Sequence, residues 1–213
     1  TVTAGTLMAV NTTGSATGSG AVTVSSGATL GGTGIIAPGV GNVVTVNGTL
    51  QVGGATPVAG QTLTIATNAA ALTINNLITF DLFSGEGNVG LNGSTTADQL
   101  LLTGNSGGAS IVLGASSIFK INTSISSGWT AGASWKLIDW ASLTPSGTFS
   151  NLNSSVGNFS DMPDLSSFGL GWDVSNLYTS GVVTVAVVPE PSRALLMLLG
   201  LLALGFRRRR IQD

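Results

Sequence analysis

The residues of this chain that could do chemistry are mainly carboxylates, because the sequence contains neither cysteine nor histidine. That absence excludes thiol nucleophiles, disulfides, Cys/His zinc sites and histidine acid–base catalysis. Two carboxylates can still hydrolyse a glycosidic bond when they lie roughly 5–10 Å apart across it. Seven carboxylates precede residue 189, and they are Asp81, Glu86, Asp98, Asp139, Asp161, Asp164 and Asp173.

The positions of these carboxylates favour turn and surface roles over catalysis. Asp81 and Asp139 lie in strand-like runs, whereas the other five lie in loops rich in Gly, Ser and Asn, where Asp commonly stabilises turns. The segment 161–164 lacks the spacing of a calcium loop, and the segment 104–108 lacks the lysine of a phosphate loop. We therefore expect no catalytic residue, no metal site and no cofactor.

The composition favours a packed β structure that would position these residues. Only 8% of the residues are charged, against roughly 25% in a typical soluble domain, while 43% are apolar. That apolar fraction is too high for a disordered chain, and Val, Leu and Ile recur regularly. The 31 glycines, with many Ser, Thr and Asn residues, suit the turns between short strands.

An internal repeat occupies the first part of the chain. Val2, Val24 and Val46 are spaced 22 residues apart, and each begins a similar segment that ends in Thr-Leu. Each unit has an alternating Val/Thr strand, a Gly-containing turn and a second short strand. A period of 20–25 residues without a helical segment is typical of one coil of a parallel β-helix, in which stacked coils bury a continuous apolar row. A β-sandwich with similar hairpins is the alternative.

The repeats also resemble a known family. The segments 14–24 and 25–34, followed by Ala37-Pro38-Gly39, resemble the autotransporter-associated β-strand repeat over roughly residues 1–54. The resemblance implies a right-handed parallel β-helix (a solenoid) of a bacterial surface protein. No segment resembles the membrane β-barrel of a true autotransporter.

The repeat blurs after residue 60, but strand-like runs continue. They are 63–65, 72–74, 77–83, 99–103, 111–113, 117–121, 135–140 and 182–188, with Gly, Asn and Ser between them. The four tryptophans, Trp129, Trp135, Trp140 and Trp172, also lie here. They could stack on sugars, but we expect these wide side chains to pack in the core or in the cap at the end of a solenoid. We predict an all-β body with a repeat solenoid over 1–75, and a continued solenoid with an irregular β cap over 76–188.

The last segment, 189–213, differs from the body in charge and pattern. The body carries a net charge of −5, whereas this tail carries +3. Pro189-Glu190-Pro191-Ser192 is a rigid, extended break, and the uncharged run 194–206 follows it. As a helix this run is roughly 20 Å long, short for a bilayer, but the flanking arginines can extend its reach. We predict a single transmembrane α-helix over 194–206, with Arg207, Arg208, Arg209 and Arg210 as a cytoplasmic stop.

The order of these three features resembles the PEP-CTERM protein-sorting signal, whose profile is related to the ice-binding protein C-terminal domain. Pro189, Glu190 and Pro191 match its signature tripeptide, and Arg207 to Arg210 match its basic end. The resemblance implies recognition by an exosortase, a membrane-embedded processing enzyme, with cleavage near the motif. Glu190 would then be a recognition element.

The sequence thus predicts a non-enzymatic bacterial surface or extracellular-matrix protein that has passed through the inner membrane. Its expected partners are the membrane, an exosortase and an extracellular polysaccharide, but not nucleic acid, because the body is acidic. An exported protein needs an N-terminal signal, so we expect the chain to be the C-terminal part of a longer or processed protein. The alternatives are a polysaccharide- or ice-binding module with a Thr-bearing face, and the C-terminal part of a polysaccharide-degrading enzyme.

Overall fold

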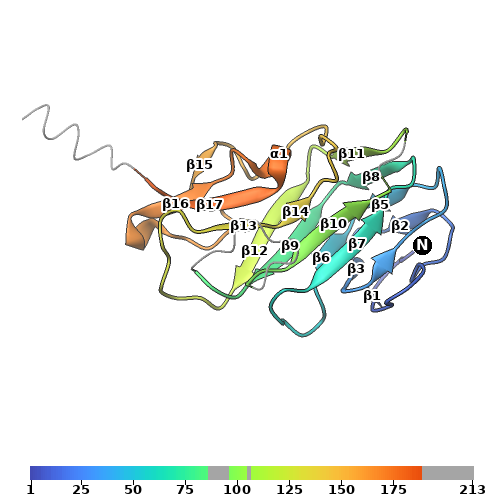
Figure 1. The fold of residues 1–213 in the computed structure, drawn as a ribbon, viewed down its shortest axis with the longest axis horizontal. Helices are drawn as coiled ribbons and strands as arrows, with labels where there is room; N and C mark the ends of the chain where they lie inside the picture. The colour runs from blue at the N-terminus through green and yellow to red at the C-terminus, as the bar shows by residue number, and fades with distance from the viewer. Residues whose placement is uncertain (86–95, 105–106, 189–213) are drawn as a thin grey trace, which may run out of the picture.

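A computed structural model describes residues 1–85, 96–104 and 107–188, and in these residues the protein is mostly β-structure (Figure 1). Their named strands form four sheets, of which three are parallel and one is antiparallel. The only helical segments in the described residues are α1 (Leu177–Ser180) and the 3-10 turn η1 (Ser166–Phe168). The all-β prediction is therefore confirmed in its coarse form. The helix predicted over 194–206 lies outside the described residues.

The three parallel sheets contain one strand from each successive stretch of chain. The first sheet has β1 (Thr6–Ala9), β3 (Thr29–Gly32), β6 (Thr49–Val52), β9 (Leu77–Leu82) and β12 (Ile118–Thr123). The second has β4 (Ile35–Ile36), β7 (Thr62–Ala66), β10 (Gln99–Thr103) and β14 (Ile138–Asp139). The third has β2 (Val22–Val24), β5 (Val44–Val46), β8 (Ala71–Ile74) and β11 (Ser110–Leu113). From β2 to β12 the chain visits the third, first and second sheets in an unchanging cycle.

The repeat read from the sequence sets the register of these sheets. The equivalent residues pair directly: Val2 with Val24, Val24 with Val46, Leu7 with Leu30, and Leu30 with Leu50. From Val24 onward these Val and Leu side chains are buried, because strand residues alternate between the two faces of a sheet. The 22-residue spacing therefore identified true structural equivalents.

Close backbone packing and one hydrogen bond between asparagine side chains stabilise the turns at one edge of the parallel sheets. Gly48 lies between β5 and β6, where a side chain would overlap the carbonyl oxygens of Ala28 and Ser25, so the turn requires glycine. Next to it, Asn75 donates a side-chain hydrogen bond to Asn47 Oδ1 at 2.8 Å. Asn47 follows β5 and Asn75 follows β8, so the bond links two successive corners.

The fourth sheet, here called the end sheet, lies at one end of the molecule (Figure 1). It is antiparallel in the order β13-β17-β16-β15, with β13 (Ser134–Lys136), β15 (Val156–Gly157), β16 (Leu170–Asp173) and β17 (Val182–Val187). Three of the tryptophans, Trp129, Trp135 and Trp172, pack against one another with ring centroids 5.6–6.2 Å apart. The fourth, Trp140, is also buried and donates its indole N–H to the Leu177 carbonyl at 2.6 Å.

The run 135–140 was predicted as one strand, but the structure divides it between two sheets. Its first part belongs to β13 of the end sheet, and its last part belongs to β14 of the second parallel sheet. Leu137 lies at the division, where its N–H donates to the Gly181 carbonyl and its carbonyl accepts from the Leu100 N–H, both at 2.9 Å. Leu137 therefore bonds to the residue that precedes β17 and to β10, so the change of sheet leaves none of its backbone groups unpaired.

Candidate functional site

The predicted sorting residues lie outside the described part of the chain. They are Pro189, Glu190, Pro191, Arg207, Arg208, Arg209 and Arg210, together with the run 194–206. The structure instead describes the point from which they follow. β17 ends at Val187, whose side chain is 65% exposed, and the Val188 N–H donates to the Gly169 carbonyl at 3.3 Å. The body therefore ends at the surface of the end sheet (Figure 1).

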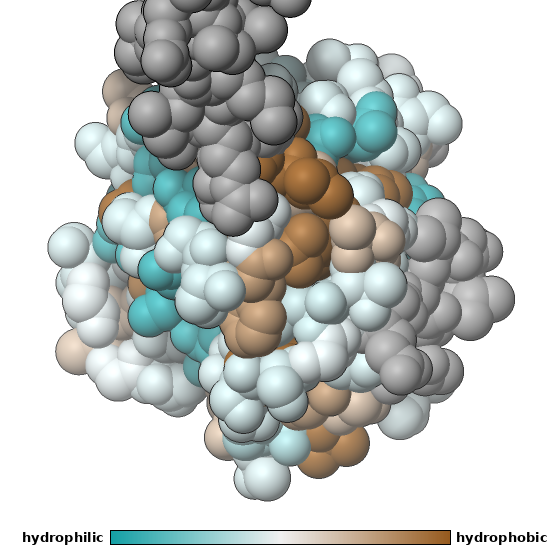
Figure 2. Space-filling model, turned by 90° about the vertical axis from the view of Figure 1, so that its left-hand side faces the viewer, coloured by the Kyte–Doolittle hydropathy of each residue, from teal (hydrophilic) through white to brown (hydrophobic). Residues whose placement is uncertain are grey.

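The surface at this end is mixed in polarity. Figure 2 looks onto the end of the molecule, where apolar side chains lie among polar ones. The exposed large apolar residues of these elements are Val156, Phe168 and Val187. Among residues 1–85, 96–104 and 107–188, no helix is both long enough and apolar enough to cross a membrane.

Two rows of threonine run across the parallel sheets. Thr23, Thr45 and Thr73 pair in register on β2, β5 and β8. Thr6, Thr29 and Thr49 pair in register on β1, β3 and β6. None of these six threonines is buried, whereas the valines on either side of Thr23 and Thr45 are buried. At a strand spacing of ~4.8 Å, each row of three is roughly 10 Å long. The rows end at Val112 and Leu77, so each is short.

Asp164 and Asp173 have the turn roles that the sequence predicts. Asp164 Oδ1 accepts from the Ser166 N–H, and Asp173 Oδ1 accepts from the Ser175 N–H, both at 2.9 Å. The Ser166 hydrogen bond lowers the pKa of Asp164. Burial disfavours charge on Asp139, but the bond from Lys136 Nζ at 2.8 Å and a backbone N–H outweigh it and lower the pKa of Asp139.

Asp98 departs from the predicted surface role, because its side chain is fully buried. Its Oδ1 accepts from the Gln61 N–H at 3.1 Å, while Oδ2 has no hydrogen-bond partner among the described residues. Burial raises the pKa of Asp98 to about 7 in spite of the Gln61 bond, and the nearby charge of Asp81 adds to the rise. Gly53 packs directly on Oδ2, at a φ of +95°, and a side chain there would overlap the carboxyl group.

The tryptophans are packing residues, as expected. Trp129, Trp135, Trp140 and Trp172 are each at most 9% exposed. Their indole faces are occupied by each other and by the surrounding core. They are therefore not a sugar-stacking surface in the folded protein.

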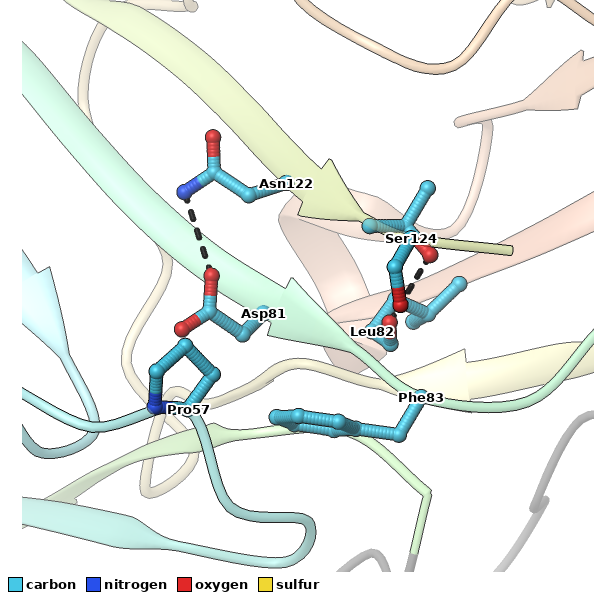
Figure 3. Close-up of a pocket in the computed structure, with 7 residues that line it drawn as sticks. Pro57, Asp81, Leu82, Phe83, Asn122 and Ser124 are labelled. Carbon is cyan, nitrogen blue, oxygen red and sulfur yellow. Dashed lines mark hydrogen bonds between the residues drawn. The ribbon is translucent and has the colours of Figure 1, made fainter. Parts of the chain in front are cut away.

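A cavity of about 260 Å³ lies outside the first sheet, where β9 and β12 end (Figure 3). Asp81 and Asn122 are paired in the sheet, and Asn122 Nδ2 donates to Asp81 Oδ1 at 3.1 Å. Phe83 follows β9 on the same face as Asp81, and Pro57 reaches the cavity from the loop between β6 and β7 (Figure 3). The Thr123 hydroxyl, which donates to the Leu82 carbonyl at 2.8 Å, also lines it.

A second cavity, of about 350 Å³, adjoins the first. It is lined by Lys120, Ile121, Asn122, Thr123, Ser160, Asp161, Met162 and Pro163. Asn122 and Thr123 line both cavities, so the two adjoin at these residues, and the pair of cavities beside β9, β12 and the segment 160–163 is here called the groove. Asp161 is held there by bonds from the Ser160 hydroxyl at 2.9 Å and Asn151 Nδ2 at 3.3 Å.

The described residues contain no group of three or more Asp or Glu side chains that could hold a metal ion. The groove instead combines single carboxylates with amide, hydroxyl and ring groups. Such a set can bind polar neutral molecules through hydrogen bonds and ring contacts. Comparison with protein-family models, with curated proteins and with solved structures gives no match for this chain.

Sequence reasoning missed the groove and the burial of Asp98 for one reason. The repeat spacing places Val24 and Val46 correctly, but 41 residues separate Asp81 from its partner Asn122. A longer stretch of sequence between β9 and β10 lengthens this turn of the chain, so no period connects the two residues. The one signal of the groove in the sequence was the spacing of Asp81 and Phe83, which are two residues apart in a strand-like run and must therefore share a face.

Proposed function

We propose that this protein is a non-enzymatic surface or extracellular-matrix protein of a bacterium, delivered by its C-terminal tail. The observation that carries the proposal is the order of Pro189-Glu190-Pro191, the apolar run 194–206 and four arginines, which resembles the PEP-CTERM sorting signal. Membrane insertion of the run would place the arginines in the cytoplasm and the acidic body outside. An exosortase would then cleave near the motif and release the body to the envelope.

The place where the described body ends supports this proposal. Val187 is exposed and Val188 is the last described residue, at the end of the molecule away from the parallel sheets (Figure 1). A processing enzyme in the membrane can reach a segment that starts from such a surface without unfolding the body.

We further propose that the body is a right-handed parallel β-helix capped by the end sheet. The cyclic visit to three parallel sheets and the direct pairing of the repeats support a helical winding. Right-handedness follows the general rule for crossovers between parallel strands. A stalk of this kind suits a structural role, because each coil rests only on its neighbours and the length can vary by whole coils.

The sorting proposal is tested by replacing Pro189, Glu190 and Pro191 with alanine in a bacterial host that has an exosortase. We expect the protein to accumulate uncleaved in the inner membrane and to be lost from the surface, as measured by fractionation and surface labelling. A variant with Ser126 and Ser127 changed to alanine, in an exposed loop, is the control and should be sorted normally. Unchanged processing of the triple variant would refute the proposal.

A second candidate function, binding of ice or polysaccharide by the threonine face, is favoured by the registered row Thr23, Thr45 and Thr73. Its test is the triple change of these residues to valine, which keeps the strand shape but removes the hydroxyls. Loss of ice recrystallisation inhibition, or of retention on a polysaccharide column, would support this function. Unaltered behaviour in both assays would exclude the row as a binding face.

A further inference from the structure

We propose that the groove across β9, β12 and the segment 160–163 binds an uncharged oligosaccharide. One sugar ring would lie in the cavity beside Phe83 and Pro57, and the next in the cavity beside Ser160. This binding site goes beyond the proposed surface role and does not depend on the sorting tail.

The first cavity has the two kinds of group that sugars require. Phe83 offers a ring to the C–H face of a pyranose, and Asp81 with Asn122 offers planar oxygen and nitrogen atoms to its hydroxyls (Figure 3). A carboxylate is the stronger partner, because hydrogen bonds to charged groups are roughly twice as strong as neutral ones. At about 260 Å³ the cavity is near the lower end of small-molecule pockets, as expected for one ring.

The joining of two cavities indicates a chain rather than a single sugar. Asn122 and Thr123 line both, so a ligand that fills the first cavity reaches the second by passing over these two side chains. The groove crosses the strands, and neighbouring strands are ~4.8 Å apart, so each step along the groove brings a new set of outward side chains. A chain of linked sugars can place successive units against these different sets of side chains.

The polar groups of the groove are fixed before any ligand arrives. Asp81 is held by Asn122, and Asp161 is held by Ser160 and Asn151. The backbone of the second cavity is joined to β12 by the bond from the Ile121 N–H to the Asp161 carbonyl at 3.0 Å. Preorganised groups lose little conformational entropy on binding, which favours affinity even in a shallow site.

The charges in the groove select against acidic sugars. Asp81 and Asp161 face the groove against Lys120 alone, so its described side chains carry a net negative charge. A uronic acid would be repelled by the two carboxylates, whereas a neutral or N-acetylated sugar would not.

The test is calorimetric titration of the full chain, in detergent, with tetrasaccharides of glucose, galactose and N-acetylglucosamine, each up to about 10 mM. We expect at least one to bind, the matching monosaccharide to bind roughly tenfold more weakly, and a tetrauronate not to bind. Asn122→Ala and Phe83→Ala should weaken binding roughly tenfold or more. Phe168→Ala, which removes an exposed ring from the end sheet, is the matched control and should bind as the unaltered protein does.

The outcomes separate cleanly. Absence of binding for all three neutral tetrasaccharides, or equal loss in Phe83→Ala and Phe168→Ala, would overturn the proposal. Tighter binding of the tetrauronate would overturn the charge argument and the ligand class with it. Asn122 is exposed, so its alanine variant is expected to fold, and circular dichroism of each variant checks this. The sorting experiment is unaffected by any of these results, since the tail is intact in every variant.

Discussion

The parallel sheets and the end sheet of this protein solve the same packing problem with different residues. In the parallel sheets, small and medium side chains such as Val24, Val46 and Leu50 stack on their own equivalents in neighbouring strands. At the end sheet, Trp129 packs edge to face on Trp135 and Trp172, and no repeat relates the three. The difference teaches that stacked equivalent strands can be filled by repeating the same side chains, whereas a sheet without a repeat is filled by a few large side chains of particular shape.

The largest loss of stability is expected when a tryptophan is removed from the end sheet. Trp172→Ala should lower the free energy of unfolding by about 3–5 kcal/mol, because it empties the centre of the cluster and removes the indole bond to the Pro163 carbonyl. Urea denaturation followed by circular dichroism measures the loss. Trp172→Phe should lose clearly less, since it keeps a ring. A loss below about 1 kcal/mol for the alanine variant would show that the cluster does not stabilise the end sheet.

The buried carboxyl group of Asp98 gives the parallel sheets a pH dependence. Its pKa is raised from 3.8 to about 7 in the folded protein, so the protonated form stabilises the fold. This stabilisation is complete below about pH 4 and is lost as the pH rises to about 7, up to about 4 kcal/mol in total. Asp98→Asn, which resembles the protonated group, should be stable without this decline, as urea midpoints at several pH values would show.

The pH window itself separates the effect of Asp98 from that of Asp139, which lies on β14 of the same parallel sheet as β10. Asp139 has a lowered pKa, so its contribution is lost only as the pH falls below the ordinary range of a carboxyl group. A decline between pH 4 and 7 that persisted in Asp98→Asn would therefore assign the effect to another group.

A smaller effect is expected at the corner of the parallel stack. Asn75→Ala removes the 2.8 Å bond to Asn47 and should cost about 1–2 kcal/mol by leaving the partner oxygen unsatisfied. The neighbouring change Asn76→Ala is the control, because in the described part of the chain the Asn76 side chain has no hydrogen bond. Equal unfolding midpoints for the two variants would show that the bond between Asn75 and Asn47 does not stabilise the fold.

The smallest change in stability is expected for an outward residue of a parallel strand, and it is compared with a change at the buried residue next to it. Thr45→Val alters an outward residue and should change stability by less than about 0.5 kcal/mol. Val46→Thr places a hydroxyl among buried apolar side chains and should cost about 1–3 kcal/mol. A reversal of this order, measured by urea denaturation, would mean that the two residues face the opposite way.

The sequence predicts the parallel stack better than the end sheet, for a physical reason. Alternation of Val and Thr with a 22-residue repeat specifies both the strands and their register, because equivalent residues must stack. The end sheet has no repeat, and its strands β15 and β16 lie within a loop-like stretch of Ser, Gly and Asn. Their pairing depends on distant partners, such as Trp172 with Val185, that no local pattern announces.

The candidate groove shows the same limit. The sequence places Asp81 in a strand, but its contact with Asn122 depends on loops of irregular length between β9 and β12. The burial of Asp98 depends likewise on Gly53 and Gln61, two residues of the connection between β6 and β7. Sequence patterns therefore find side chains on one strand more readily than sites assembled from several.

The position of β17 in the end sheet determines how the sheet resists a force applied to the chain beyond Val188. β17 is an inner strand, with β13 on one side and β16 on the other. A pull on the chain beyond Val188 acts along this strand, perpendicular to the hydrogen bonds on both of its sides. Those bonds are then loaded together in shear rather than opened one at a time.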